Sequence, residues 1–237
     1  MDIGILYNIF VCLITGLVAF IVFFALRKKR KQKKLVYSEG LDYFCLLLSL
    51  VWLSVAARFL LSWLGYSSLS TIVFKWVIGP LGYLHLIPGF YYLSWSFFGD
   101  SNRRRWLFNV VFTLAALVAV FTLFKHGFRE AEATYWGSKI EINPQATSIF
   151  VFGIFLPGFL LIMVEFVRRF IQWRKNGSHN AKQMFGFSLG FLVYALTGIF
   201  ERAIWTQGWQ MLLVRIGIMM SSLILYFSAT LEEEGDQ

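Results

Sequence analysis

The sequence has few charged residues. Only 15% of its 237 residues are Asp, Glu, Lys or Arg, against about 25% in a typical soluble domain, whereas 58% are hydrophobic and 19% aromatic. A soluble domain of this length cannot bury so much apolar surface, because surface-to-volume scaling limits the size of its core. The scarcity of charge therefore excludes an ordinary soluble domain and favours a chain whose solvent is lipid.

Cysteine and histidine are scarce as well. The two cysteines, Cys12 and Cys45, lie in apolar runs without partners for a zinc site, so we interpret them as small buried side chains. The three histidines, His85, His126 and His179, fall in different segments, and no H-E-x-x-H motif is present. Since no nucleophile, base and oxyanion group converge either, we expect no metal, no cofactor and no enzymatic activity.

Long apolar runs dominate what remains. A membrane-spanning helix needs about 20 mostly apolar residues, and seven segments meet this requirement. They run Ile3–Leu26, Leu41–Trp63, Thr71–Phe97, Trp106–Phe124, Thr147–Phe170, Met184–Trp205 and Trp209–Thr230. The sequence therefore predicts an all-α, polytopic membrane domain over residues 1–231, followed by a short acidic tail at 232–237.

Proline and glycine predict irregular places in two of these segments. Pro80 and Pro88, together with Gly79, Gly82 and Gly89, predict a kinked or broken third helix. Pro157, flanked by Gly153 and Gly158, predicts a kink in the fifth.

Two further features concern packing. Gly186 and Gly190 form a G-x-x-x-G pattern, which is typical of close helix packing. The longest loop, from Lys125 to Ala146, contains Tyr135 and Trp136, and is expected either to cover the bundle as a lid or to lie on its surface.

The distribution of Lys and Arg predicts the orientation. The loops after the first, third and fifth segments carry 15 of these residues, including the run from Arg27 to Lys34, whereas the opposite loops carry only Lys125, Arg129 and Lys139. This bias places the N-terminus outside and the C-terminus in the cytoplasm. It also accounts for the net charge of +9 by contact with a lipid bilayer, so no nucleic-acid partner is expected.

Five ionisable residues remain near the outer ends of the predicted helices. They are Arg58, Lys75, Glu201, Arg202 and Arg215. Charges at membrane depth are costly, and each is therefore a candidate functional residue. We call these five residues the outer layer. Their excess of positive charge lies on the outer side, contrary to the positive-inside preference, so membrane topology does not explain it.

The outer layer has a functional and a structural interpretation. Arg58 and Arg215, the deeper pair, are suited to hold a carboxylate or phosphate in fork geometry. In the structural alternative, Lys75 and Arg202 extend to the interface, and Arg58 forms an interhelical ion pair with Glu201.

Two ionisable residues lie elsewhere in the spans. His85, near the middle of the third segment, is either a hydrogen-bonded packing residue or part of a ligand site. Glu165 in the fifth segment has Arg168 and Arg169 at i+3 and i+4, which predicts helical ion pairs.

Local patterns over the whole chain resemble one known family. These are the run 56–60 (Ala-Ala-Arg-Phe-Leu), the short arginine-rich loop 99–105, and the basic loop 168–183 that leads into Gly186 and Gly190. The chain resembles the seven-helix sensory region of prokaryotic membrane histidine kinases and related signalling proteins. The resemblance implies a prokaryotic cytoplasmic membrane and a sensor whose ligand binds in the membrane or from outside. The kinase or cyclase domain of that family does not follow here, so output is expected to pass through a separate protein partner.

We therefore hypothesise a stand-alone receptor or regulatory subunit that binds a small anionic or lipid-like ligand. The candidate ligand-binding residues are Arg58, Arg215, Lys75, Glu201, Arg202 and His85. A transporter or permease subunit is the first alternative, and predicts a polar path inward through His85 and Glu165. A structural subunit of a larger membrane complex is the second.

Overall fold

A computed structural model describes residues 3–31, 40–126, 132–139, 148–203 and 209–231. The side chains at 126, 132–134, 137–139 and 202–203 are outside the described part. The predicted acidic tail at 232–237 also lies outside the described residues.

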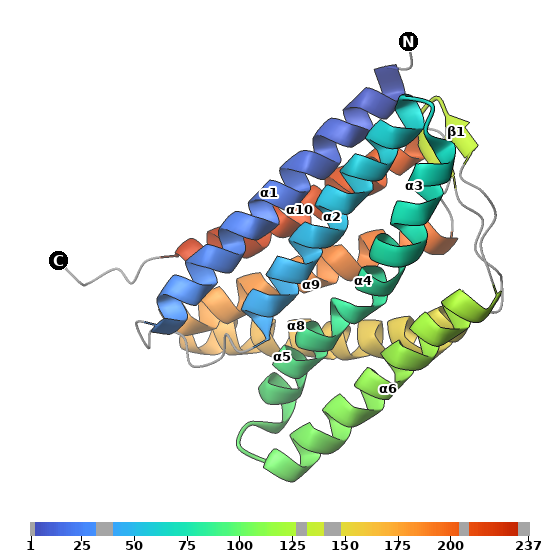
Figure 1. Cartoon of the computed structure of the whole chain (residues 1–237). Helices are drawn as coiled ribbons and strands as arrows, with labels where there is room; N and C mark the ends of the chain where they lie inside the picture. The colour runs from blue at the N-terminus through green and yellow to red at the C-terminus, as the bar shows by residue number, and fades with distance from the viewer. Residues whose placement is uncertain (1–2, 32–39, 127–131, 140–147, 204–208, 232–237) are drawn as a thin grey trace.

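Helices make up nearly all of the described chain (Figure 1). They are α1 Ile3–Lys31, α2 Leu41–Trp63, α3 Ser67–Val73, the π-helix η1 Phe74–Ile78, α4 Gly79–Leu84, α5 Leu86–Phe98, α6 Asn102–His126, the π-helix η2 Val151–Phe155, α8 Leu156–Asn176, α9 His179–Ala203 and α10 Gln210–Thr230. Among the described residues, seven helical segments are long and apolar enough to cross a membrane. This confirms the predicted all-α membrane fold, since helices satisfy their own backbone hydrogen bonds in lipid.

The helices extend beyond the apolar runs at their charged ends. α2 has the predicted bounds, but α6 begins at Asn102 and α9 at His179. Arg103, Arg104 and Arg105 therefore lie in the first turn of α6, not in a loop as predicted. Hydropathy cannot mark such ends, because helical hydrogen bonding continues into the interface, where charged side chains are solvated.

The predicted break in the third segment is confirmed. Its chain runs through α3, η1, α4 and α5, with His85 at the junction between α4 and α5. Proline has no N–H to donate to the carbonyl four residues earlier, and η1 ends two residues before Pro80. In the same way, η2 ends two residues before Pro157, so the predicted irregularity in the fifth segment is also present.

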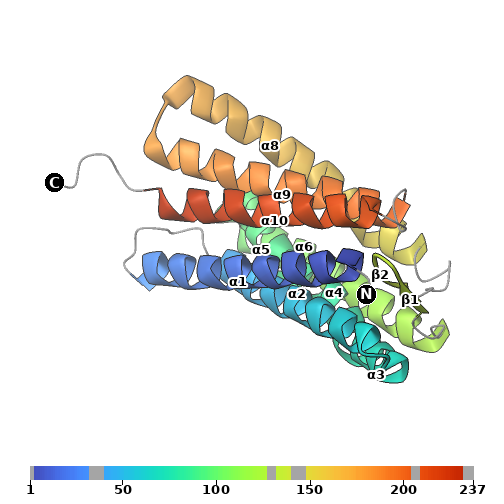
Figure 2. The same cartoon turned by 90° about the horizontal axis from the view of Figure 1, so that it is seen from above.

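The spans form two layers (Figure 2). α8, α9 and α10 lie side by side in one layer, and α1 lies against α10 at the start of the other. α9 and α10 pack closely, because a Cβ at Gly190 would lie 2.7 Å from Leu225 and one at Gly186 would collide with Ser228. The G-x-x-x-G prediction is thereby confirmed.

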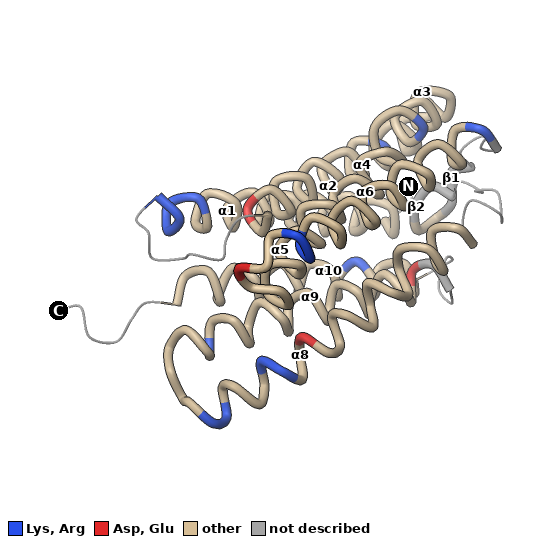
Figure 3. The backbone as a smooth tube through the Cα atoms, turned by 90° about the horizontal axis from the view of Figure 1, so that it is seen from below, with Lys and Arg blue, Asp and Glu red and all other residues tan. Residues whose placement is uncertain are grey.

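One end of the bundle carries most of the charge, and we call it the basic end. It contains the end of α1, the start of α6 and the end of α8 (Figure 3). Arg30 forms a 2.9 Å ion pair with buried Asp42 at the start of α2, and the Lys29 ammonium donates a 2.6 Å hydrogen bond to the Leu231 carbonyl after α10. These bonds tie α1 to both of its neighbours.

The opposite end, which we call the hairpin end, carries two short antiparallel strands, β1 (Glu132–Thr134) and β2 (Gly137–Lys139). The side chain of buried Asn8 donates a hydrogen bond to the carbonyl of Trp136 in the turn. Gly4 leaves room for Tyr135 and Trp136 against α1. The described part of the predicted long loop therefore packs on the start of α1.

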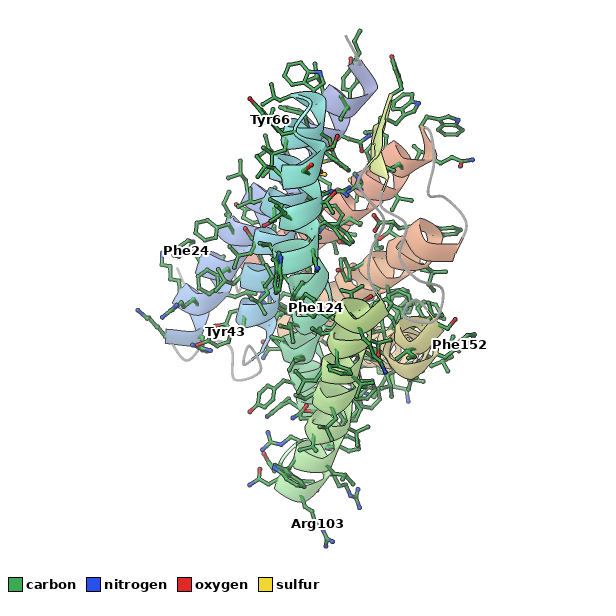
Figure 4. All side chains as sticks on the ribbon, turned by 45° about the vertical axis from the view of Figure 1, so that its right-hand side comes forward. Phe24, Tyr43, Tyr66, Arg103, Phe124 and Phe152 are labelled. Carbon is green, nitrogen blue, oxygen red and sulfur yellow. The ribbon has the colours of Figure 1, made fainter. Side chains whose placement is uncertain are left out.

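Large apolar side chains cover the outside of the bundle (Figure 4). Phe24 on α1 and Phe152 in η2 project from opposite sides in this view, and both are more than half exposed. Such a surface suits contact with lipid tails.

Candidate functional site

The candidate site is built around two buried arginines near the hairpin end. Arg58 comes from α2 and Arg215 from α10, and their exposed fractions are only 6% and 5%. Their guanidinium carbons lie 4.9 and 4.8 Å from the centre of one ring, that of fully buried Phe59. The structure therefore brings together the two residues that the sequence analysis identified as the deeper pair.

The guanidinium of Arg215 is surrounded by two aromatic rings and two weak polar contacts. Its carbon lies 5.1 Å from the centre of the Trp52 ring, in addition to Phe59. Nη1 lies 3.5 Å from the sulfur of Cys12, and Nη2 lies 3.4 Å from the Glu201 carboxylate, whose side chain is 33% exposed. Nε is buried and makes no hydrogen bond within the described part of the chain.

These contacts stabilise a buried cation without using its donors fully. A desolvated cation–π contact contributes about 2 kcal/mol. Hydrogen bonds near 2.8 Å are normal between charged donors and carboxylates, whereas the contact of Arg215 with Glu201 is 3.4 Å long and its other polar partner is a thiol. The in-plane N–H groups are thus available for a closer acceptor.

Arg58 links the pair to the broken third span. Its guanidinium carbon lies 5.3 Å from the centre of the Phe74 ring, and Phe74 is the first residue of η1. The rings of Phe59 and Phe74 therefore both pack on Arg58, one from its own helix and one from the π-helix.

Glu201 contacts Arg215, whereas the structural alternative paired it with Arg58. The ion pair joins α9 to α10 at 3.4 Å. Within the described residues, this carboxylate therefore offsets part of the positive charge beside Arg215.

Lys75 lies apart from the pair. Its ammonium nitrogen is 5.5 Å from the ring of Trp76, which is 63% exposed. Arg202 lies on α9, but its side chain is outside the described part of the structure.

His85 also lies apart, in the aromatic interior. Its Nδ1 is 3.0 Å from the Leu81 carbonyl and its Nε2 is 2.5 Å from the Tyr194 hydroxyl. The Phe44 ring lies 5.6 Å away. Both ring nitrogens are engaged, as in the packing interpretation.

A second polar cluster lies near the basic end, between α5 and α8. Buried Glu165 forms ion pairs of 2.9 Å with Arg168 and 2.6 Å with Arg169, which confirms the predicted helical pairs. The hydroxyl of Ser96 on α5 donates to Glu165 and accepts from Arg168 and Arg169. Sequence reasoning missed Ser96, since a serine in an apolar helix gives no signal of the partner it will meet.

Among the described residues, no group of three His, Cys, Asp or Glu side chains is placed to hold a metal ion. The Arg58–Arg215 pair is suited instead to binding an anion.

The chain matches no protein-family model, no curated protein and no solved structure. Function must therefore be argued from the chemistry of the site.

Proposed function

We propose that this protein is a membrane receptor or regulatory subunit whose ligand is a small anion or the anionic group of a lipid-like molecule. The ligand binds at the hairpin end, between the guanidinium groups of Arg58 and Arg215. With the hairpin end outside, as the charge distribution predicts, the ligand arrives from the outside or from the outer leaflet. Output passes to a separate protein partner at the basic end.

The observation that carries this proposal is the environment of Arg215. The side chain is buried, yet its carboxylate contact is 3.4 Å long, its other polar partner is the thiol of Cys12, and its Nε makes no hydrogen bond within the described chain. A buried charge is expensive unless it is well paired. A carboxylate or phosphate that accepts two N–H groups would supply the short charge-assisted bonds that these contacts do not.

The broken third span offers a route for the signal. Arg58 packs on Phe74 in η1, and the same span continues through α4 and α5 to Ser96 at the basic end. An anion that draws Arg58 towards Arg215 changes the packing of Phe74. The ligand can shift the span between two arrangements only if it binds one of them more tightly, and single π-helical turns such as η1 occur frequently at functional sites.

The contacts of His85 and Glu165 favour this function over transport. The transport alternative requires a polar path through both residues. His85 is engaged by Leu81 and Tyr194, and the ring of Phe44 packs on both His85 and Tyr194. Glu165 is held by two arginines and Ser96.

A thermal-shift screen of the detergent-purified protein tests the proposal. The probes are sulfate, phosphate, acetate and a short-chain phosphatidic acid. A ligand at 100 times its Kd stabilises the folded state by about 2.7 kcal/mol. The stabilisation should be lost in Arg58→Gln and Arg215→Gln, because each removes one half of the anion clamp.

Lys75→Gln is the matched control, since it removes one positive charge from the same half of the bundle at a lipid-facing position. It should keep the full shift. An equal shift in Arg215→Gln, or no shift with any probe, would reject the anion site and favour a structural role for the pair.

A further inference from the structure

A cavity lies in the bundle away from the arginine pair. Its volume is about 40 Å³, and its surface is apolar. Its walls include Gly89 and Leu93 on α5, Gly158 and Ile162 on α8, and Phe191 on α9. A space of about 10–15 Å³ holds one water molecule, so the cavity has room for a few methylene groups.

The lining of the cavity restricts the chemistry of its occupant. Walls without polar surface offer no hydrogen bond, so a polar molecule would lose its hydration without compensation. The wall residues Phe159 and Ile162 on α8 are only half-buried, so this side is open towards the surface that faces lipid. A hydrocarbon chain fits both features.

A cationic cluster stands one helical turn from the end of this cavity. Ser96 follows Leu93 by three residues on α5, and Glu165 follows Ile162 by three residues on α8, which is about 4.5 Å along each axis. At that level lie Arg168 and Arg169, whose two positive charges exceed the single charge of Glu165.

Arg168 has both exposure and donor capacity. Its side chain is 33% exposed, and its Nη2 holds Glu165 and Ser96. Its Nε is buried and makes no hydrogen bond within the described residues. The net charge of the cluster is therefore +1. One phosphodiester, with a charge of −1, would neutralise it.

We propose that an anionic phospholipid binds between α5 and α8, with a few carbons of one acyl chain in the apolar cavity and its phosphate against Arg168. This site is distinct from the Arg58–Arg215 pair and lies near the opposite end of the bundle, so either proposal can fail without the other. The phosphate neutralises the net positive charge of the Arg168–Arg169–Glu165 cluster, and these carbons of the acyl chain fill the cavity between α5 and α8. The same phosphate chemistry is present in free inorganic phosphate, which the experiment must distinguish.

Native mass spectrometry of the intact protein, titrated with lipid in detergent, tests the assignment. The probes are dioleoyl phosphatidylglycerol, dioleoyl phosphatidylcholine with identical chains but no net charge, and inorganic phosphate. The wild-type protein should prefer phosphatidylglycerol by about ten-fold or more, the range expected for a charge-assisted pair. Inorganic phosphate should not displace it.

Two variants separate the headgroup from the chain. Arg168→Gln should abolish the preference between the two lipids while both still bind through their chains. Ile162→Trp fills the cavity and should weaken both lipids equally. Arg174→Gln and Leu160→Trp are matched controls on exposed positions of α8, and both should bind as the wild type does.

Equal binding of the two lipids by the wild type would overturn the headgroup assignment whatever the variants do. Unchanged lipid binding in folded Ile162→Trp, or in Ile162→Phe should the larger residue prevent folding, would overturn the assignment of the cavity. Displacement of phosphatidylglycerol by inorganic phosphate at equal concentration would overturn the lipid as the source of the phosphate.

Discussion

Arg58 and Arg215 pack on one buried ring, that of Phe59, at 4.9 and 4.8 Å from its centre. The two residues are 157 positions apart in sequence and come from α2 and α10. Two like charges side by side in a low-dielectric interior repel each other strongly. The arrangement is therefore most stable when a negative group lies between or beside them, and Glu201 supplies one from a partly exposed position.

Removing Glu201 should strengthen anion binding. In Glu201→Gln, Arg215 loses its 3.4 Å carboxylate contact, so an incoming anion no longer competes with it. A partly exposed ion pair contributes up to about 1 kcal/mol, which corresponds to a gain in affinity of about two- to five-fold. Titration of the thermal shift with the best anion measures this. A loss of affinity would show that Glu201 helps to bind the ligand rather than competing with it.

Removing Glu165 should destabilise the protein strongly. Glu165→Gln leaves Arg168 and Arg169 without their buried carboxylate. Breaking a buried pair costs about 3–5 kcal/mol, and we expect about 2–4 kcal/mol here, because the arginines are partly exposed and solvent screens them. Unfolding in SDS–detergent mixtures measures the free energy. Asp100→Asn, on an exposed residue near the same end, should change it by less than about 0.5 kcal/mol.

Close packing of α9 on α10 should depend on Gly186. A Cβ there collides with the hydroxyl of Ser228, and overpacking costs about 1–3 kcal/mol. The same unfolding assay on Gly186→Ala should show this loss. Gly82→Ala in α4 is the control, since nothing lies within 4 Å of its added Cβ. It should be neutral or stabilise by up to about 1 kcal/mol through helix propensity.

The hairpin should detach more readily without Asn8. Asn8→Leu removes the donor to the Trp136 carbonyl, a bond that contributes about 1 kcal/mol. Amide hydrogen exchange at residues 132–139 should therefore become faster, while exchange in the middle of α1 stays unchanged. Tyr7→Leu, at the exposed neighbouring position, should leave the hairpin protected. Equal exchange in Asn8→Leu and the wild type would mean that other contacts hold the hairpin.

The apolar runs were sufficient to predict the seven spans, because hydropathy depends only on local composition. Proline chemistry likewise predicted the irregular third and fifth segments. The hairpin was not predicted, since its strands are three residues long and so short a segment shows no clear alternation. Depth along each helix placed Arg58 and Arg215 at a similar level, but could not show that they face each other. Nothing local indicated that Phe59, Trp52 and Cys12 would surround them.

Near the basic end, too, the sequence predicted local contacts but not contacts between distant segments. The i+3 and i+4 pairs of Glu165 follow from helix geometry alone, whereas the Ser96 bonds join residues 69 positions apart. Which faces of two helices meet depends on the packing of the whole bundle. The apolar cavity between α5 and α8 was invisible in the sequence for this reason.

The most direct test of the central claim is hydrogen exchange at the basic end when an anion binds at the hairpin end. The most stabilising probe of the thermal screen should change exchange at residues 99–105 and 176–179, the two described turns of that end, as well as around Arg58 and Arg215. Arg215→Gln should abolish both changes. Protection confined to the hairpin end would mean that the anion binds without transmitting a signal, which would contradict the receptor function.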